Sequence, residues 1–137
     1  MEVIYIRRVN YYETDAMQIV HHSNYIRFLE EARIYFMDEI GLPYKKVEEE
    51  GVLIPVIGVN CTYKTPAKFD DILDIKVKIK EYTGVKMIIS YEIVNSDTKK
   101  DIFLGETKHC FVNKDMKPIS LKKVSSEMSK IIEDTIA

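Results

Sequence analysis

The amino-acid sequence predicts an α+β fold in which a mainly antiparallel five-stranded sheet lies against one long helix. Two observations carry this prediction. One strand-like segment and one long segment with helical periodicity come first, and four further strand-like segments then follow in succession. Runs of consecutive strands beside a segregated helix are typical of α+β proteins. The later connections are too short for crossover helices, so we expect hairpins and a four-stranded meander.

The first strand is expected over residues 3–12, where side chains alternate between two faces. Each face carries an arginine, Arg7 on one and Arg8 on the other. Charges on both faces favour a place at the edge of the sheet. Residues 13–22 are then expected to form a loop.

The longest helix is expected from about Ser23 to Ile40. Its apolar residues recur at steps of three and four, the stripe of a helix that buries one face: Tyr25, Phe28, Leu29, Ala32, Phe36 and Ile40. Gly41 and Pro43 supply stop signals. A short acidic helical turn is expected over residues 43–50.

Four strands follow, at residues 53–64, 72–82, 86–95 and 102–113. The second of them alternates most cleanly, because Leu73, Ile75, Val77 and Ile79 fall on one face and Asp74, Lys76, Lys78 and Lys80 on the other. Such alternation indicates a half-exposed antiparallel strand. Residues 121–136 have helical spacing and predict a closing amphipathic helix.

Length and composition predict one domain over residues 1–137, in the cytoplasm. The net charge of −2, with both signs spread along the chain, argues against nucleic-acid binding. We find no signal-peptide pattern and no apolar run long enough to span a membrane. The two cysteines lack a metal-type or redox-type spacing and are expected to be reduced core or near-core residues.

Common catalytic motifs of nucleotide-binding and serine-hydrolase proteins do not occur in the sequence. His109 and Cys110 are adjacent in a predicted strand, so their side chains should point to opposite faces and cannot form a catalytic pair. A metal site at Asp15, His21 and His22 is disfavoured, because the chain directs neighbouring histidines apart and no second carboxylate stands at ligand spacing. We expect no metal.

The stretch "ETDAMQIVHHSNY" places a loop carboxylate, Asp15, ahead of a helix start. The first amides of a helix lack intrahelical partners and carry the positive end of its dipole, which suits an oxyanion formed in acyl transfer. Asp15 could act as general base or nucleophile, and His22 could orient the carbonyl group. The alternatives are structural: Asp15 as an Asx-turn residue, and His22, Ser23 or Asn24 as helix caps.

This stretch resembles the 4-hydroxybenzoyl-CoA thioesterase family of hotdog-fold acyl-CoA thioesterases. The matching residues are Tyr12, Thr14, Asp15, Val20, His21, His22, Tyr25, Glu31, Ala32 and Arg33. A second stretch, "CTYKTPAKFDDILDIKVKI" at residues 61–79, resembles the family's segment between its second and third strands. The resemblance covers nearly the whole chain in element order.

The resemblance implies a hotdog fold, a five-stranded antiparallel sheet wrapped around one central helix, and hydrolysis of an acyl-CoA thioester. It assigns the catalytic carboxylate to Asp15, the neighbouring histidine to His22, and to Tyr25 the backbone N–H that polarises the carbonyl. It also implies a homodimer, often assembled into a homotetramer, with the active site at the subunit interface.

Three further expectations follow from the resemblance. Coenzyme A belongs to the substrate and brings phosphates, for which Lys64 and Lys86 are candidate partners, and no cofactor is expected. The family usually has Gly at the position of Gln18, and a side chain there could reshape the loop. Two other readings are a non-catalytic acyl-CoA or acyl-carrier binding module of the same fold, and an acyl-thioester dehydratase or hydratase. His22 is followed by Ser23 and Asn24, which departs from the motif typical of the dehydratases.

Overall fold

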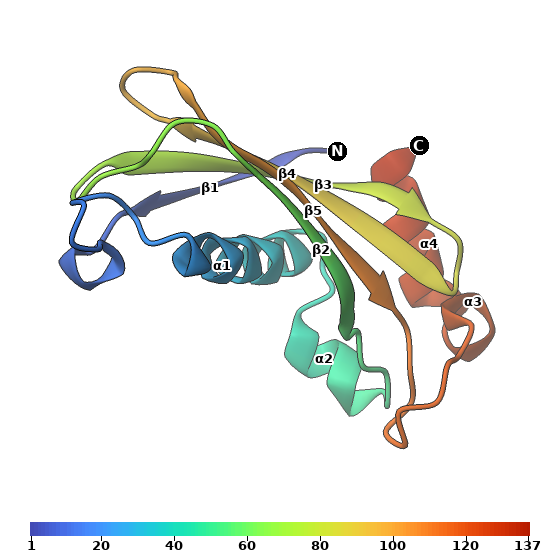
Figure 1. Ribbon diagram of the computed structural model, residues 1–137. Helices are drawn as coiled ribbons and strands as arrows, with labels where there is room; N and C mark the ends of the chain where they lie inside the picture. The colour runs from blue at the N-terminus through green and yellow to red at the C-terminus, as the bar shows by residue number, and fades with distance from the viewer.

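The computed structural model describes residues 1–137, and its sheet contains five antiparallel strands in the order β1-β3-β4-β5-β2. The strands are β1 (Val3–Arg8), β2 (Val56–Tyr63), β3 (Ile72–Tyr82), β4 (Lys86–Asn95) and β5 (Asp101–Cys110). The curved sheet covers helix α1 (Ser23–Glu39), which lies along its concave side (Figure 1). The α+β prediction is confirmed, as is the edge position of β1.

The predicted meander of four strands is wrong in one respect. Only β3, β4 and β5 form a meander, whereas β2 pairs with β5 and forms the edge opposite β1. The connection at residues 64–71 carries the chain across to β3, and it bonds to the loop before α1, since Val20 N–H donates to the Ala67 carbonyl at 2.8 Å.

The faces of the central strand are as predicted. The inward side chains of β3 are buried, and its outward ones are half-buried or exposed. Helix α1 buries the predicted stripe, from Tyr25 to Phe36, against the sheet. It ends before Gly41, whose φ of +85° is a left-handed conformation that glycine adopts without steric cost. Helix α2 (Tyr44–Glu49) follows as expected.

Three predicted elements are shorter than expected. β1 ends at Arg8 because the backbone turns into a 3₁₀ helix, η1 (Tyr11–Glu13). β2 begins only at Val56, after Pro55, and β5 ends at Cys110. Leu53 and Val112 still form an isolated bridge beyond the ends of β2 and β5.

The predicted terminal helix is two helices, α3 (Leu121–Val124) and α4 (Ser126–Ile136). Ser125 breaks the run because its backbone is extended and its hydroxyl accepts a hydrogen bond from Met128 N–H at 3.2 Å. A serine that bonds to the backbone two or three residues ahead favours a helix start over a helix interior. The chain ends meet here, since the N-terminal ammonium donates to the Thr135 carbonyl at 2.6 Å. No helix of the chain is long and apolar enough to cross a membrane.

Candidate active site

The loop between η1 and α1 is closed on itself like a small hairpin. Thr14 and Val20 form a bridge, Asp15 N–H donates to the Ile19 carbonyl at 2.9 Å, and Gln18 N–H donates to the Asp15 carbonyl at 2.9 Å. These bonds give the loop one defined shape, with Asp15 near its neck.

The two oxygens of the Asp15 carboxylate differ in their hydrogen bonding. Oδ1 accepts from Met17 N–H at 2.9 Å, which is the Asx turn considered from the sequence. Oδ2 makes no hydrogen bond within the chain, and the residue is half-buried. The structural and the functional readings of Asp15 are therefore compatible.

Gln18 has a φ of +66°, in the left-handed region. Residues with a Cβ atom adopt this region at a cost of roughly 1–2 kcal/mol, whereas glycine does not. The loop thus keeps the backbone shape that a glycine would favour, even though the glycine is absent.

A cavity of about 170 Å³ opens beside this loop. It is lined from both sides, by the loop with the start of α1 and by the end of β2 with the residues that follow it: Asp15, Met17, Ile19, Val20, His22, Tyr25, Tyr63, Lys64, Thr65 and Pro66. The structure therefore brings together four of the five candidate residues from the sequence, namely Asp15, His22, Tyr25 and Lys64.

Fewer backbone N–H groups at the start of α1 lack a hydrogen-bond partner than the sequence suggested. Asn24 N–H donates to the His21 carbonyl at 2.9 Å, and Tyr25 N–H makes only a long bond of 3.3 Å, to the His22 carbonyl. The N–H of His22 has no partner within the chain. The amides of His22 and Tyr25 are accordingly the two that a carbonyl oxygen of a substrate could engage most readily.

The two histidines do not point apart, contrary to the expectation from their adjacency. Their rings stack with centroids 4.3 Å apart. Nδ1 of His21 lies 2.8 Å from the Ser23 hydroxyl, and only His22 lines the cavity. No group of three or more His, Cys, Asp or Glu side chains is placed to hold a metal ion.

Two aromatic side chains, Tyr25 and Tyr63, line the cavity, and Phe103 packs against both. Tyr25 stacks on Phe103 with centroids 5.4 Å apart, and Tyr63 meets both rings edge-on. The Phe103 ring lies over Gly105, where a Cβ atom would come within 2.5 Å of it. Any side chain at Gly105 would therefore displace this ring.

The Tyr25 hydroxyl is part of the scaffold. It accepts a hydrogen bond from Ala67 N–H at 3.3 Å, and burial raises the pKa of this phenol above its ordinary value. The side chain is neutral and anchored at physiological pH. A role for Tyr25 in the reaction would therefore fall to its backbone N–H.

Residues 9–130 of the chain match the family described as the thioesterase-like superfamily. A putative esterase from Aquifex aeolicus (strain VF5) is 38% identical over 130 residues, which are 95% of this chain and 99% of that protein. A protein of Bacillus subtilis (strain 168), the putative acyl-CoA thioesterase YneP, is 33% identical over 84% of this chain and 83% of its own length. The chain belongs to the thioesterase-like superfamily.

The fold comparison agrees. The crystal structure of DHNA-CoA thioesterase from Staphylococcus aureus superposes with a TM-score of 0.92 at 25% identity, covering 97% of this chain and 89% of that one. The predicted hotdog fold and the suspected family are thereby confirmed, and the chain is a thioester hydrolase of this superfamily.

Lys86 is the one candidate residue that does not line this cavity. It begins β4 and lines a different hollow of about 240 Å³, together with Glu81 and Lys108. The β3–β4 turn lies beside α3 and α4, at the opposite end of the sheet from η1 and the start of α1 (Figure 1). Its role in binding coenzyme A stays a prediction.

Cys110 and His109 have different environments, as their adjacency in a strand predicted. His109 is fully buried and Cys110 is half-buried, and Cys61 is also a free, half-buried thiol.

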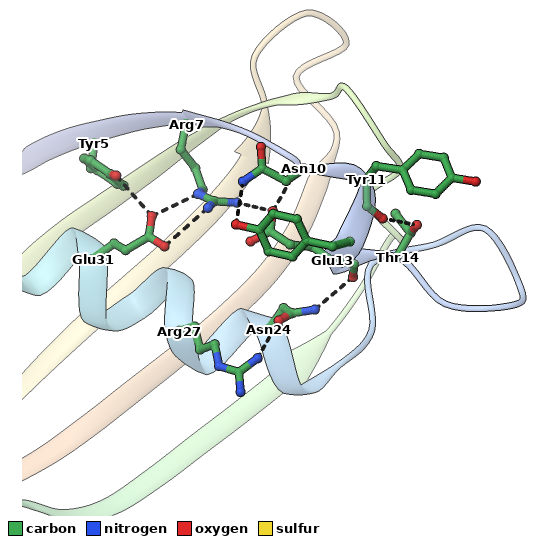
Figure 2. A network of polar contacts seen from close by, with 10 residues as sticks. Tyr5, Arg7, Asn10, Tyr11, Glu13, Thr14, Asn24, Arg27 and Glu31 are labelled. Carbon is green, nitrogen blue, oxygen red and sulfur yellow. Dashed lines mark hydrogen bonds and ion pairs between the residues drawn. The ribbon is translucent and has the colours of Figure 1, made fainter.

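Sequence reasoning missed several residues of the site. Tyr63 was not singled out because a tyrosine is an ordinary residue in a strand such as β2, although it directly precedes Lys64. Arg7 and Glu13 were also missed, and Figure 2 shows them in a polar network that adjoins the loop of residues 14–22. Glu13 stands two residues before Asp15 and begins the stretch that resembles the family, but neither fact indicates that its side chain meets Arg7.

Proposed function

We propose that this protein hydrolyses acyl-CoA thioesters to a free acid and coenzyme A. The observation that carries the proposal is the cavity beside the loop, because Asp15, whose carboxylate has one free oxygen, and residues at the start of α1 with free or weakly bonded backbone N–H groups both line it. The names of relatives such as YneP, a putative acyl-CoA thioesterase, support the substrate class.

In the proposed reaction the thioester carbonyl oxygen points to the N–H groups of His22 and Tyr25, which stabilise the negative charge that develops there. Oδ2 of Asp15 takes a proton from water, and the resulting hydroxide attacks the carbonyl carbon. The C–S bond then breaks, and the proton held by Asp15 passes to the sulfur, so that coenzyme A leaves as the thiol and the carboxylate is regenerated. Direct attack by the carboxylate would give an anhydride that water cleaves to the same products.

The proposal also assigns roles to His22 and Lys64 and addresses the need for a cofactor. His22 and Lys64 both line the cavity. In the proposed reaction the His22 ring orients the acyl group, and Lys64 meets a phosphate of coenzyme A. No cofactor is required, because water, the carboxylate and the amides supply every step. Coenzyme A enters as part of the substrate.

We further propose that two copies of the chain pair through the β2 edge, which places the site at a subunit interface. Strand β2 forms one free edge of the sheet and exposes a set of large apolar side chains, namely Val56, Ile57, Val59 and Tyr63. Exposed edge strands with apolar side chains are usually covered in soluble proteins. Two of these residues, Ile57 and Tyr63, also line hollows of the surface.

The decisive test is thiol release from a panel of short, long and aromatic acyl-CoA esters by the parent and by Asp15→Asn. The amide keeps the shape but is not basic, so we expect a loss of about 10²–10⁴-fold in kcat. Asp97→Asn, in an exposed turn, is the matched control and should keep the parent rate. Equal rates in Asp15→Asn and the parent would refute the role of Asp15. Binding of the esters without thiol release by the parent would favour the binding-module alternative.

A further inference from the structure

Arg7 of β1 lies between two carboxylates that belong to different elements (Figure 2). Its Nη1 donates to Oε1 of Glu13 at 2.6 Å, and its Nε and Nη2 donate to the two oxygens of Glu31 at 2.9 and 3.3 Å. The guanidinium also lies over the Phe28 ring, 4.2 Å from its centroid. Arg7 thus joins the edge strand to helix α1 and to the turn before the loop of residues 14–22.

Glu13 is the more deeply buried of the two carboxylates. Its side chain is 6% exposed, compared with 38% for Glu31. It accepts a second hydrogen bond, from Asn10 N–H at 2.7 Å, which closes η1. Burial alone would lower the pKa of Arg7, but the hydrogen bond to Glu13 and the charges of both carboxylates outweigh it and raise that pKa above its ordinary value. Arg7 therefore keeps its positive charge within this cluster.

The backbone of Glu13 holds the far end of the loop. Its carbonyl oxygen accepts from His21 N–H at 2.9 Å and from the Asn24 side-chain amide at 2.8 Å. One residue therefore fixes where the chain enters the loop, two positions before Asp15, and where it leaves, one position before His22. Neither Arg7 nor Glu13 lines the cavity.

We propose that Glu13, held by Arg7, is a positioning residue that sets the separation between the Asp15 carboxylate and the amides at the start of α1. The bond to Glu31 secures Arg7 to the helix body but has no direct connection to the loop. The catalytic consequence rests on the proposed function, whereas the effect on loop order does not.

The matched experiment compares Glu13→Gln with Glu31→Gln, because both remove one carboxylate from Arg7 and keep the side-chain shape. For Glu13→Gln we expect kcat to fall about 10–100-fold, the range expected when reacting groups move by up to about 1 Å, while KM changes less than about threefold. Glu31→Gln should keep kcat within about threefold. Equal losses in the two variants would overturn the proposal, since they would indicate a general effect on folding.

Asn24→Ala tests the same proposal in a second way. It removes a hydrogen bond to the Glu13 carbonyl and leaves the ion pair between Arg7 and Glu13 intact. We expect kcat to fall by about threefold to tenfold with the pH profile displaced relative to the parent. Unchanged kcat and pH profile in both Asn24→Ala and Glu13→Gln would refute the positioning role.

Amide hydrogen exchange separates this inference from the proposed function. In Glu13→Gln, exchange should speed up at least tenfold over residues 14–22 and stay at the parent rate in β4 and β5. This result is expected even if the parent releases no thiol from any acyl-CoA, in which case only the proposed function fails. Unchanged exchange over residues 14–22 would overturn the inference whether or not the parent is active.

Discussion

The chain buries two arginines in two different ways. Arg7, whose side chain is 11% exposed, has two carboxylate partners, Glu13 and Glu31. Arg33 of α1 is 9% exposed and forms no ion pair, because its donors meet only the hydroxyls of Tyr44 at 3.1 Å and Tyr91 at 3.2 Å. The first cluster adjoins the loop that carries Asp15, and the second lies between α1, α2 and the sheet.

The second cluster continues through neutral groups. The Tyr91 hydroxyl lies 2.7 Å from the Thr107 hydroxyl, which in turn lies 2.8 Å from Nε2 of His109. Burial, with a smaller effect of the Arg33 charge, lowers the pKa of His109 to about 4. The carbonyls of Ile54 and Pro55 oppose this shift, but Nδ1 has no hydrogen bond of good geometry.

The two clusters should respond differently to the loss of a charged partner. A carboxylate stranded without its cation costs several kcal/mol, so the Arg7 cluster must be complete or absent. Hydroxyl groups that lose a charged partner remain neutral and can still bond to each other. The Arg33 cluster should therefore survive the loss of its charge, and the following changes test that contrast in order of expected size.

The largest effect is expected for Arg7→Met, which leaves the buried Glu13 carboxylate without its cation. Removing one partner of a buried ion pair costs about 3–5 kcal/mol. Urea unfolding at pH 7 measures the loss, with Arg8→Met as control because Arg8 forms only an exposed, long pair with Asp70 at 3.4 Å. A loss below about 1 kcal/mol would show that the charged cluster does not depend on Arg7.

The second effect concerns the pH dependence of stability. His109 has a folded-state pKa of about 4, below the ordinary value of about 6.5, so the unfolded chain takes up the proton first as the pH falls. At about 1.4 kcal/mol per pKa unit, this residue removes roughly 3 kcal/mol of stability between pH 6.5 and 4.

His109→Gln should therefore unfold with a shallower pH dependence than the parent over that range, whatever its stability at pH 7. Paired unfolding curves at pH 7 and 4.5 provide the comparison. His21→Gln, which changes an exposed histidine, should follow the parent. Parallel pH profiles for the parent and His109→Gln would contradict a neutral, buried His109.

A smaller effect is expected for Arg33→Met. Replacement of a buried charge by an apolar side chain of similar length is often close to neutral, and the Tyr91 hydroxyl keeps its bond to Thr107. We expect the free energy of unfolding to change by no more than about 1.5 kcal/mol, within the range of a single hydrogen bond. A loss as large as that of Arg7→Met would remove the contrast between the clusters.

The smallest effect is expected for Gln18→Gly, in the loop that the Arg7 cluster secures. Glycine relieves the cost of φ +66° but gives more freedom to the unfolded chain, so a net gain of about 0.5 kcal/mol is expected. Thermal unfolding measures it, with Gln18→Ala as control because alanine keeps the strain. A loss of stability in the glycine variant would show that the Gln18 side chain itself supports the loop.

Most of the elements followed from the sequence because their signals are local. The apolar stripe of α1 and the alternation of β3 state directly which side of each element avoids water. The loop with Asp15 and His22 was also located from its residues and from the family resemblance. These features depend on side chains that are neighbours along one element.

The pairing of strands and the partners of polar groups came only from the tertiary structure. The Ile, Val and Tyr content of β2 indicates a strand but carries no information on which strand lies beside it, so β2 was placed in a meander rather than at the far edge. Lys64 and Lys86 were equal candidates in the sequence, yet only Lys64 lines the cavity.

The kinds of elements, their order and the place of the loop that carries Asp15 can all be predicted from the sequence alone. The tertiary structure decided that Arg7 meets Glu13 and Glu31, while Arg33 meets only hydroxyl groups. The physical reason is that the free energy of a buried charge depends on groups brought close by folding from distant positions in the chain. The residue type alone does not show whether an arginine will be buried among carboxylates or among hydroxyl groups.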